Sequence, residues 1–569
     1  MADKIETRCR GLAVCLAAWL LFGAATVTQA ADSDDEIIAE INRLVRLGWE
    51  QSKVTPSERC EDGEFARRVS LDVIGRIPTL EQLAEFFDDT SPTKRRDFVN
   101  KLLDDPDYVT NWSTIWANML VGRGGRNNRA GRPRLEAWLR RSLYKNQAYN
   151  QFAFDLISAE GDSDENGAVN FLSAHLNDGA VPATAITSRI FLGLQVQCTQ
   201  CHNHPFNDWK QSQFWGMNAY FRGTRAQRQG TDRGDIVLTD NPATALVFFE
   251  KRSGIQEAIQ RQFVDGSRID VGEAELDQPR KQLAKLVTDP TKPFLTQTQV
   301  NRVWGHCFGY GFTKPVDDMG PHNPPSNAEL VNYLSDQFTK GGFDNKRLIR
   351  WITASEAYNL SSQPGEGNKD DDPAAGNTPL FSRMYLKNFT AEQLYDSLIV
   401  ATDAHKANRN ADAAENQRRD WLNQFIRTFG TDDNAETTLF NGTITQALLM
   451  MNGELIANAT SDAKGSFLRR LLEEDSRKLP NARKKTSASA AAAKKPAAKS
   501  SGSSSAKAPP ALQRKIDQLY LASLCRTPTD EELRRINAVF QDAGTRDPIA
   551  GLQDLFWAIL NSNEFIINH

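Results

Sequence analysis

Apolar residues recur at helical spacing along most of the chain, and this pattern predicts a mainly α protein. Ile37, Ile41 and Leu44 follow one another at intervals of four and three residues, which indicates an amphipathic helix. Trp112 and Trp116 lie four residues apart, and we expect both to face a core. Helix starts are indicated where Ser or Thr precedes Glu or Gln by three residues. These starts are Thr79, Ser326 and Thr529.

The pattern changes near the middle of the chain. Short segments rich in β-branched and aromatic residues begin at Ile236, Ala245 and Ser267, and Gly, Pro and Asp separate them. They predict a small sheet or hairpin between two helical parts. We therefore expect a helical domain at 32–225, a β-rich connector at 226–289 and a second helical domain at 290–569.

The first thirty residues have the pattern of a secretory signal. Three basic residues precede an apolar run over 11–27, and small residues allow cleavage after Ala30. We expect export to the periplasm or cell envelope. An uncleaved anchor and lipidation at Cys15 are the alternatives. No later segment is apolar enough to predict a transmembrane helix in the mature chain.

A basic segment at 477–515 interrupts the second helical domain. It contains eleven Lys or Arg and no Asp or Glu, so the rest of the chain carries a formal charge of −4 − 11 = −15. Such a composition cannot bury a core, and we expect disorder. We expect a soluble linker, and contact with an envelope polyanion as partner is the alternative. Nucleic acid is not expected, because the chain carries an export signal.

The densest candidate chemistry is Cys198-Thr-Gln-Cys201-His202. Cys-x-x-Cys-His is the attachment signature of c-type haem, in which two thiols bind the vinyl groups and the histidine binds the iron. Export favours this interpretation, since haem c is attached in oxidising compartments. A zinc site is one alternative. A disulfide, or a pair of ordinary buried cysteines without any cofactor, is the other.

The residues around this motif supply further candidates. Cys198 and Cys201 continue an apolar stripe from Ile190, which predicts a helix that ends near Asn203. We expect His204 to hydrogen-bond a haem propionate or to fix the loop. The candidates for the distal iron ligand are Met217, His175, His306 and His322.

A second candidate site lies in the loop that contains Asp317, Asp318 and His322. Paired carboxylates with a histidine suit a metal ion or acid–base chemistry. Alternatively, both aspartates pair with Arg302 and help to begin the next helix.

Longer motifs resemble a known pair of domains. Phe65-Ala-Arg-Arg68-Val-Ser-Leu71-Asp72-Val-Ile-Gly75-Arg-Ile-Pro78-Thr79 and the segment 197–209 resemble the planctomycete cytochrome-associated domain of unknown function. Asn301-Arg302-Val-Trp304 and the segment 315–326 resemble the companion domain that usually follows it. This resemblance implies an exported, largely helical protein of two domains. The first domain of the family is often found with cytochrome c modules, and its activity is not established.

Three hypotheses about function follow. The leading one is an exported haem c-binding or redox-associated protein that exchanges electrons with a redox partner. The second is a periplasmic metal-assisted hydrolase that uses Asp317, Asp318 and His322. The third is a non-catalytic envelope or surface protein in which Cys198 and Cys201 are only structural.

Overall fold

A computed structural model describes residues 32–123, 131–205, 207–228, 235–241, 246–269, 278–407, 409–429, 443–473, 510–542 and 547–569. The predicted signal at 1–30 and residues 477–509 of the basic segment lie outside this part. Residues 510–515 are helical, so the prediction of disorder is wrong for them. Pro510 begins that helix, and Leu512 packs against the core.

The described chain is mainly α, as the apolar periodicity predicts. The helices of its first part are α2 (Asp34–Ser52), α3 (Asp62–Ile74), α4 (Leu80–Asp88), α5 (Lys94–Asp104), α6 (Pro106–Val121), α7 (Arg132–Tyr144), α8 (Tyr149–Ser158), α9 (Val169–Ser173), α10 (Asn177–Leu192), η1 (Gln197–Gln200) and α11 (Gln211–Asn218). Among the described residues, no helix is both long and apolar enough to cross a membrane.

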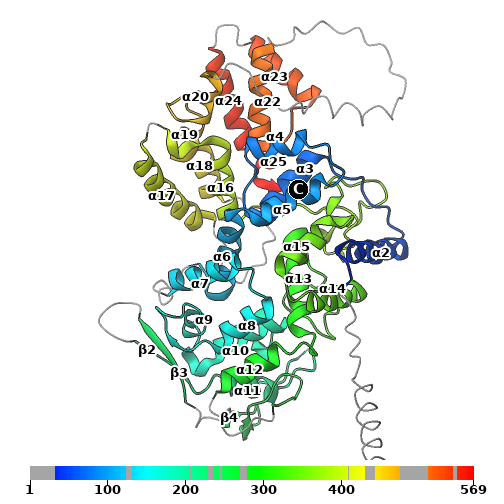
Figure 1. Cartoon of the computed structure of the whole chain (residues 1–569), viewed down its shortest axis with the longest axis vertical. Helices are drawn as coiled ribbons and strands as arrows, with labels where there is room; N and C mark the ends of the chain where they lie inside the picture. Colours follow the sequence, from blue (N-terminus) through cyan, green and yellow to red (C-terminus); the bar gives the residue numbers. More distant parts are fainter. Residues whose placement is uncertain are drawn as a thin grey trace, which may run out of the picture.

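The second part is also helical. Its helices are α12 (Pro279–Val287), α13 (Phe294–Phe308), α14 (Ala328–Lys340), α15 (Asn345–Ala354), η3 (Ala357–Asn359), η4 (Pro373–Ala375), α16 (Ala391–Thr402), η5 (Ala404–Lys406), α17 (Ala411–Phe429), α18 (Ile444–Asn452), α19 (Glu454–Ala459), α20 (Phe467–Glu473), α22 (Pro510–Leu524), α23 (Asp530–Asp542), α24 (Pro548–Leu560) and α25 (Asn563–Ile566). In Figure 1, α22 to α24 lie at one end of an elongated molecule, and β2 to β4 lie at the other.

The strands are short and antiparallel. A three-stranded sheet has the order β1 (Gly161–Asp162), β3 (Ile236–Asp240), β2 (Thr224–Arg228), and β4 (Leu246–Glu250) pairs with β5 (Gln256–Gln260). The strand predicted from Ser267 is wrong over 267–269, and the rest of that segment lies outside the described residues. β4 instead turns back through Gly254, whose φ of 79° suits a tight turn, and pairs with the polar strand β5.

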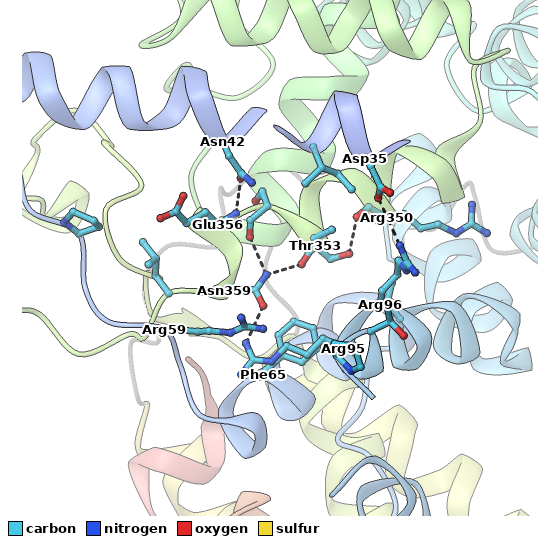
Figure 2. A pocket seen from close by; sticks show the side chains of 18 of the residues that line it. Asp35, Asn42, Arg59, Phe65, Arg95, Arg96, Arg350, Thr353, Glu356 and Asn359 are labelled. Carbon is cyan, nitrogen blue, oxygen red and sulfur yellow. Dashed lines mark hydrogen bonds and ion pairs between the residues drawn. The ribbon is translucent and has the colours of Figure 1, made fainter. Parts of the chain in front are cut away.

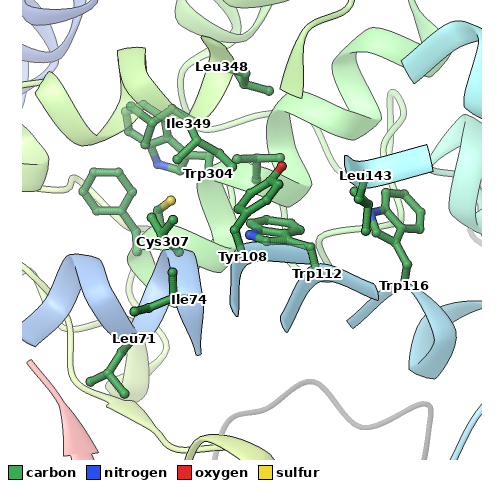
Figure 3. Packing of buried hydrophobic residues seen from close by; sticks show 14 of the residues in the cluster. Leu71, Ile74, Tyr108, Trp112, Trp116, Leu143, Trp304, Cys307, Leu348 and Ile349 are labelled. Atoms are coloured by element: carbon green, nitrogen blue, oxygen red, sulfur yellow. The ribbon is translucent and has the colours of Figure 1, made fainter. Parts of the chain in front are cut away.

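One hydrophobic core connects the two predicted helical domains. Trp112 and Trp116 of α6 are buried, as their spacing predicts, and Trp304 of α13 is buried in the same cluster. Figure 3 shows these rings in one layer with Cys307 and the side chains of α3. The ring of Trp112 lies 4.9 Å from that of His306, centroid to centroid. Helices from both halves of the sequence therefore bury their apolar faces together.

Two buried arginines of α3 bind backbone carbonyls of distant parts of the chain. The Arg67 guanidinium donates to the carbonyls of Ser523 and Phe565 at 2.7 and 2.6 Å. Arg68 donates to the carbonyls of Tyr358 and Leu360 at 2.7 and 3.0 Å. A buried guanidinium needs such acceptors to offset its desolvation. The arginine pair of the first long motif therefore joins distant segments of the fold.

Asp72 of the same motif forms the centre of a buried polar network. Its carboxylate accepts from Lys387 Nζ at 2.5 Å, from the Tyr358 hydroxyl at 2.8 Å and from Asn568 Nδ2 at 2.9 Å. Asn568 belongs to β7 (Ile567–Asn568), which pairs with β6 (Lys387–Asn388). The chain thus ends beside α3, where Figure 1 marks its C-terminus.

Two distant turns share one local structure. α3 is followed by Gly75 and α22 by Cys525, and both residues have positive φ, 73° and 58°. The next residue, Arg76 or Arg526, donates to a carboxylate at 2.6 Å. The predicted helix starts at Thr79 and Thr529 are confirmed, since each threonine hydroxyl accepts a hydrogen bond from the backbone N–H of the residue three positions later. The chain therefore contains the same helix–turn–helix arrangement twice.

Candidate functional site

The backbone that carries the cysteine motif is a loop with one turn of 3₁₀ helix. α10 ends at Leu192, because Gly193 takes a left-handed conformation with φ 64°. A Cβ at Gly193 would lie 2.6 Å from Thr298 Oγ1 of α13. The predicted continuous helix from Ile190 to Asn203 is therefore wrong, and the cysteines lie on the separate turn η1 and directly after it.

The two thiols are exposed and unbonded to each other. Cys198 and Cys201 are both free cysteines at the protein surface. Between them Thr199 is buried, and its hydroxyl donates to the Val196 carbonyl at 2.6 Å. The turn therefore points its small hydroxyl inward and both sulfur atoms outward, where a thiol-reactive group can reach them.

His202 is exposed on the same turn. Its Nδ1 lies 2.6 Å from the carbonyl oxygen of Asn203. A carbonyl only accepts, so Nδ1 carries a proton, and in the neutral tautomer that makes this hydrogen bond the lone pair lies on Nε2. A ring fixed in this tautomer is prepared to bind a metal through Nε2.

The loop is held against α11. Gln211 Nε2 and Trp215 Nε1 both donate to the Gln200 carbonyl, at 3.2 and 3.1 Å. The Gln211 backbone N–H donates to Asn203 Oδ1 at 2.9 Å. The His204 backbone N–H donates to the Trp209 carbonyl at 2.9 Å. Exposed donor side chains are thus carried on an anchored backbone, and this arrangement limits how far they can move.

The second predicted site lies against the first. The Met319 backbone N–H donates to the Gly193 carbonyl at 2.7 Å. Asp317 accepts from Gln195 Nε2 at 3.2 Å and lies 3.5 Å from the Arg189 guanidinium. These loops are more than a hundred residues apart along the chain, and no local pattern predicts their contact.

The predicted pairing of both aspartates with Arg302 is wrong. The Arg302 guanidinium instead donates to the Ile190 carbonyl at 2.7 Å. The predicted helix start at Ser326 is also displaced by one residue. Asn327 is the N-cap of α14, and its side chain accepts from the Leu330 N–H at 3.0 Å.

A histidine from each loop faces the other. The rings of His204 and His322 lie 6.4 Å apart, centroid to centroid. His322 Nε2 lies 3.2 Å from Asp318 Oδ1, and both side chains are about one-fifth exposed, 18% and 20%. His204 therefore contacts a residue of the second helical region. The sequence pattern predicts instead that His204 hydrogen-bonds a haem propionate or fixes its own loop.

Metal binding by Asp317, Asp318 and His322 gains no geometric support. In the part of the chain that the structure describes, no three or more His, Cys, Asp or Glu side chains are grouped to hold a metal ion. Asp317 is directed to Arg189 instead. The metal site stays a prediction.

The predicted distal ligands differ in their surroundings. Met217 of α11 is fully buried in the core. His175 Nε2 lies 2.7 Å from the Leu120 carbonyl, and His306 Nε2 lies 2.8 Å from the Asp72 carbonyl. Burial lowers the pKa of both imidazoles, so each is held neutral with Nε2–H donating. His322 is the candidate whose ring lies beside a residue of the cysteine loop.

Comparisons with known proteins identify two family regions. Residues 40–226 match the model of PSCyt2, described as a protein of unknown function (DUF1549). Residues 279–540 match the model of PSD1, also described as a protein of unknown function (DUF1553). No curated protein and no solved structure matches the chain. The resemblance to this pair of domains is confirmed, and neither description assigns an activity.

Proposed function

We propose that this chain, which joins a PSCyt2 region to a PSD1 region in the usual order of these domains, is an exported protein that carries covalent haem c and exchanges electrons with a redox partner. Cys198 and Cys201 would form the two thioethers, and His202 would bind the iron.

The observation that carries this proposal is the state of the three donor groups. Both thiols and the imidazole are exposed on one turn, and the hydrogen bond from His202 Nδ1 to Asn203 leaves Nε2 with its lone pair. Covalent haem c needs two accessible thiols and one such nitrogen. The residues present therefore fit the group.

A bound haem would supply one-electron chemistry at this surface. The protein supplies the rest. Gln211 and Trp215 hold the loop through the Gln200 carbonyl, which restricts the orientation of the donor side chains. Exposure of Cys198 and Cys201 places the proposed group where a partner protein can approach it closely.

The test is a pyridine haemochrome spectrum of the full chain, exported from cells with an active haem c maturation system. We expect one covalent haem per chain, and none in Cys198→Ala/Cys201→Ala. Cys60→Ala is the matched control, because Cys60 is also a free cysteine but is buried outside the motif, and it should keep its haem.

A colourless wild-type protein from cells that mature another haem c protein would refute the proposal. Metal analysis of the same sample would then distinguish stoichiometric zinc from a metal-free protein, and thiol titration would show whether Cys198 and Cys201 form a disulfide.

A further inference from the structure

An arginine-lined cavity lies far along the sequence from the cysteine motif. It has a volume of about 600 Å³ and is bounded by α2, α5, α15 and residues 56–60 (Figure 2). Five arginines line it, against two carboxylates. The arginines are Arg46, Arg59, Arg95, Arg96 and Arg350, and the carboxylates are Asp35 and Glu356.

The two lining carboxylates are already paired. Glu356 lies 2.6 Å from Arg46, and Asp35 lies 3.6 Å from Arg96. Asp35 and Arg96 are both largely exposed, at 85% and 51% of their side-chain surface, so water screens their interaction. Neither carboxylate is therefore left to neutralise the remaining three arginines.

Those three arginines have different partners. Arg95 is fully bonded within the fold: it pairs with Asp62 at 3.0 Å, outside the cavity lining, and donates to Asn359 Oδ1 at 2.8 Å and to the Cys60 carbonyl at 2.7 Å. Arg350 donates to the neutral Asn100 Oδ1 at 2.9 Å. Within the described part of the chain, the Arg59 guanidinium makes no ion pair and no side-chain hydrogen bond.

Arg59 is held close to a like charge. Partial burial and the neighbouring Arg95 guanidinium lower the pKa of Arg59. Figure 2 shows both side chains converging beside Asn359, with Arg96 and Arg350 across the cavity near Asp35. Asp62 is near both guanidinium groups, but its carboxylate is bonded to Arg95 and Lys94, so Arg59 has no anion bonded to it and an oxyanion in the cavity would supply one.

We propose that this cavity binds a small organic oxyanion, a phosphate or sulfate monoester, with Arg59 as its principal donor. Guanidinium groups bind the oxygens of such esters in a bidentate fashion. The cavity is larger than a bare ion requires and lies within the usual range of small-molecule sites. Ile38, Phe65 and Val99 contribute apolar wall to receive the organic group.

The test is isothermal titration calorimetry of the full chain with phenyl phosphate, phenyl sulfate and inorganic phosphate. Loss of one charge-assisted contact should weaken ester binding at least about tenfold in Arg59→Gln. Because the Arg59 side chain makes no ion pair or hydrogen bond within the described residues and lies near the like charge of Arg95, this variant should unfold at a temperature no lower than that of the wild type.

Arg43→Gln is the matched control. Arg43 lies on α2, one of the helices that bound the cavity, and pairs with Glu40 at 2.7 Å, but it does not line the cavity, so its replacement should leave ester affinity unchanged. Absence of ester binding, or equal loss in both variants, would overturn the proposed site. Equal affinity for inorganic phosphate would overturn the role given to the apolar wall.

Discussion

Replacing Asp72 by alanine should destabilise the protein more than any single surface change. The carboxylate is 3% exposed and its partner Lys387 is 13% exposed, with 2.5 Å between the charged atoms. Alanine would leave the buried ammonium with only the carbonyls of His306 and Cys307 as acceptors. It would also leave the Tyr358 hydroxyl without its acceptor.

The magnitude follows from this geometry. Removing one member of a buried ion pair typically costs about 3–5 kcal/mol, because the remaining charge is left unpaired. A domain is commonly stable by only about 5–15 kcal/mol, so Asp72→Ala should remove a large fraction of the free energy of unfolding. The exposed pair of Glu85 and Lys101, each 68% exposed, gives the comparison: Glu85→Ala should cost about 0–1 kcal/mol.

Urea unfolding followed by tryptophan fluorescence measures both variants, and the chain has eleven tryptophans. A double variant, Asp72→Ala/Lys387→Met, removes both charges and should cost less than the sum of the two single changes. If Asp72→Ala shifts the unfolding free energy by no more than Glu85→Ala does, the buried ion pair contributes no more to stability than an exposed one.

Four further outcomes are expected. Burial lowers the pKa of His306, so the unfolded chain binds the proton first and stability should fall as pH drops below about 6.5; His306→Gln should flatten this part of a plot of melting temperature against pH. Hydrogen bonds from Arg526 lower the pKa of Glu532 to about 2, so its stabilisation is present above about 4.5 and lost toward pH 2; Glu532→Gln should flatten the curve only in that window. Met217→Leu, a buried volume-conserving change, should cost less than about 1.5 kcal/mol in urea unfolding and leave the visible spectrum of the haem protein without pyridine unchanged; a changed spectrum with the covalent haem retained would identify Met217 as a ligand. Gly193→Ala should cost about 1 kcal/mol or more for its positive φ, and unchanged unfolding would contradict the left-handed helix end.

The helical content was predictable because it depends on local patterns. Trp112 and Trp116 face the core as their spacing requires, and the caps at Thr79 and Thr529 follow from neighbouring residues alone. The path of the cysteine segment was not predicted, although Gly193 was visible in the sequence. A glycine ends a helix only where the backbone takes positive φ, and the close approach of Thr298 from α13 is a tertiary contact.

The candidate site was predicted residue by residue but not as an assembly. The residue types of the cysteine motif and of the Asp318–His322 loop each indicate a candidate binding site. Their meeting depends on the packing of α10 against α13, which no local pattern records. The cavity around Arg59 was missed for the same reason, since its arginines come from three helices and a loop.

The contacts of Arg67 have a consequence for how the chain can be divided. Its carbonyl acceptors, at Ser523, Glu564 and Phe565, are more than 450 residues further along the chain, so these bonds can form only after those residues have been synthesised. Until then α3 carries a guanidinium group whose burial in an apolar interior would be unfavourable, because its carbonyl acceptors are missing. Contacts between residues so far apart in the sequence also form slowly. Expression of residues 40–226 alone should therefore give an aggregation-prone product, because a family boundary in the sequence is not a boundary of independent folding.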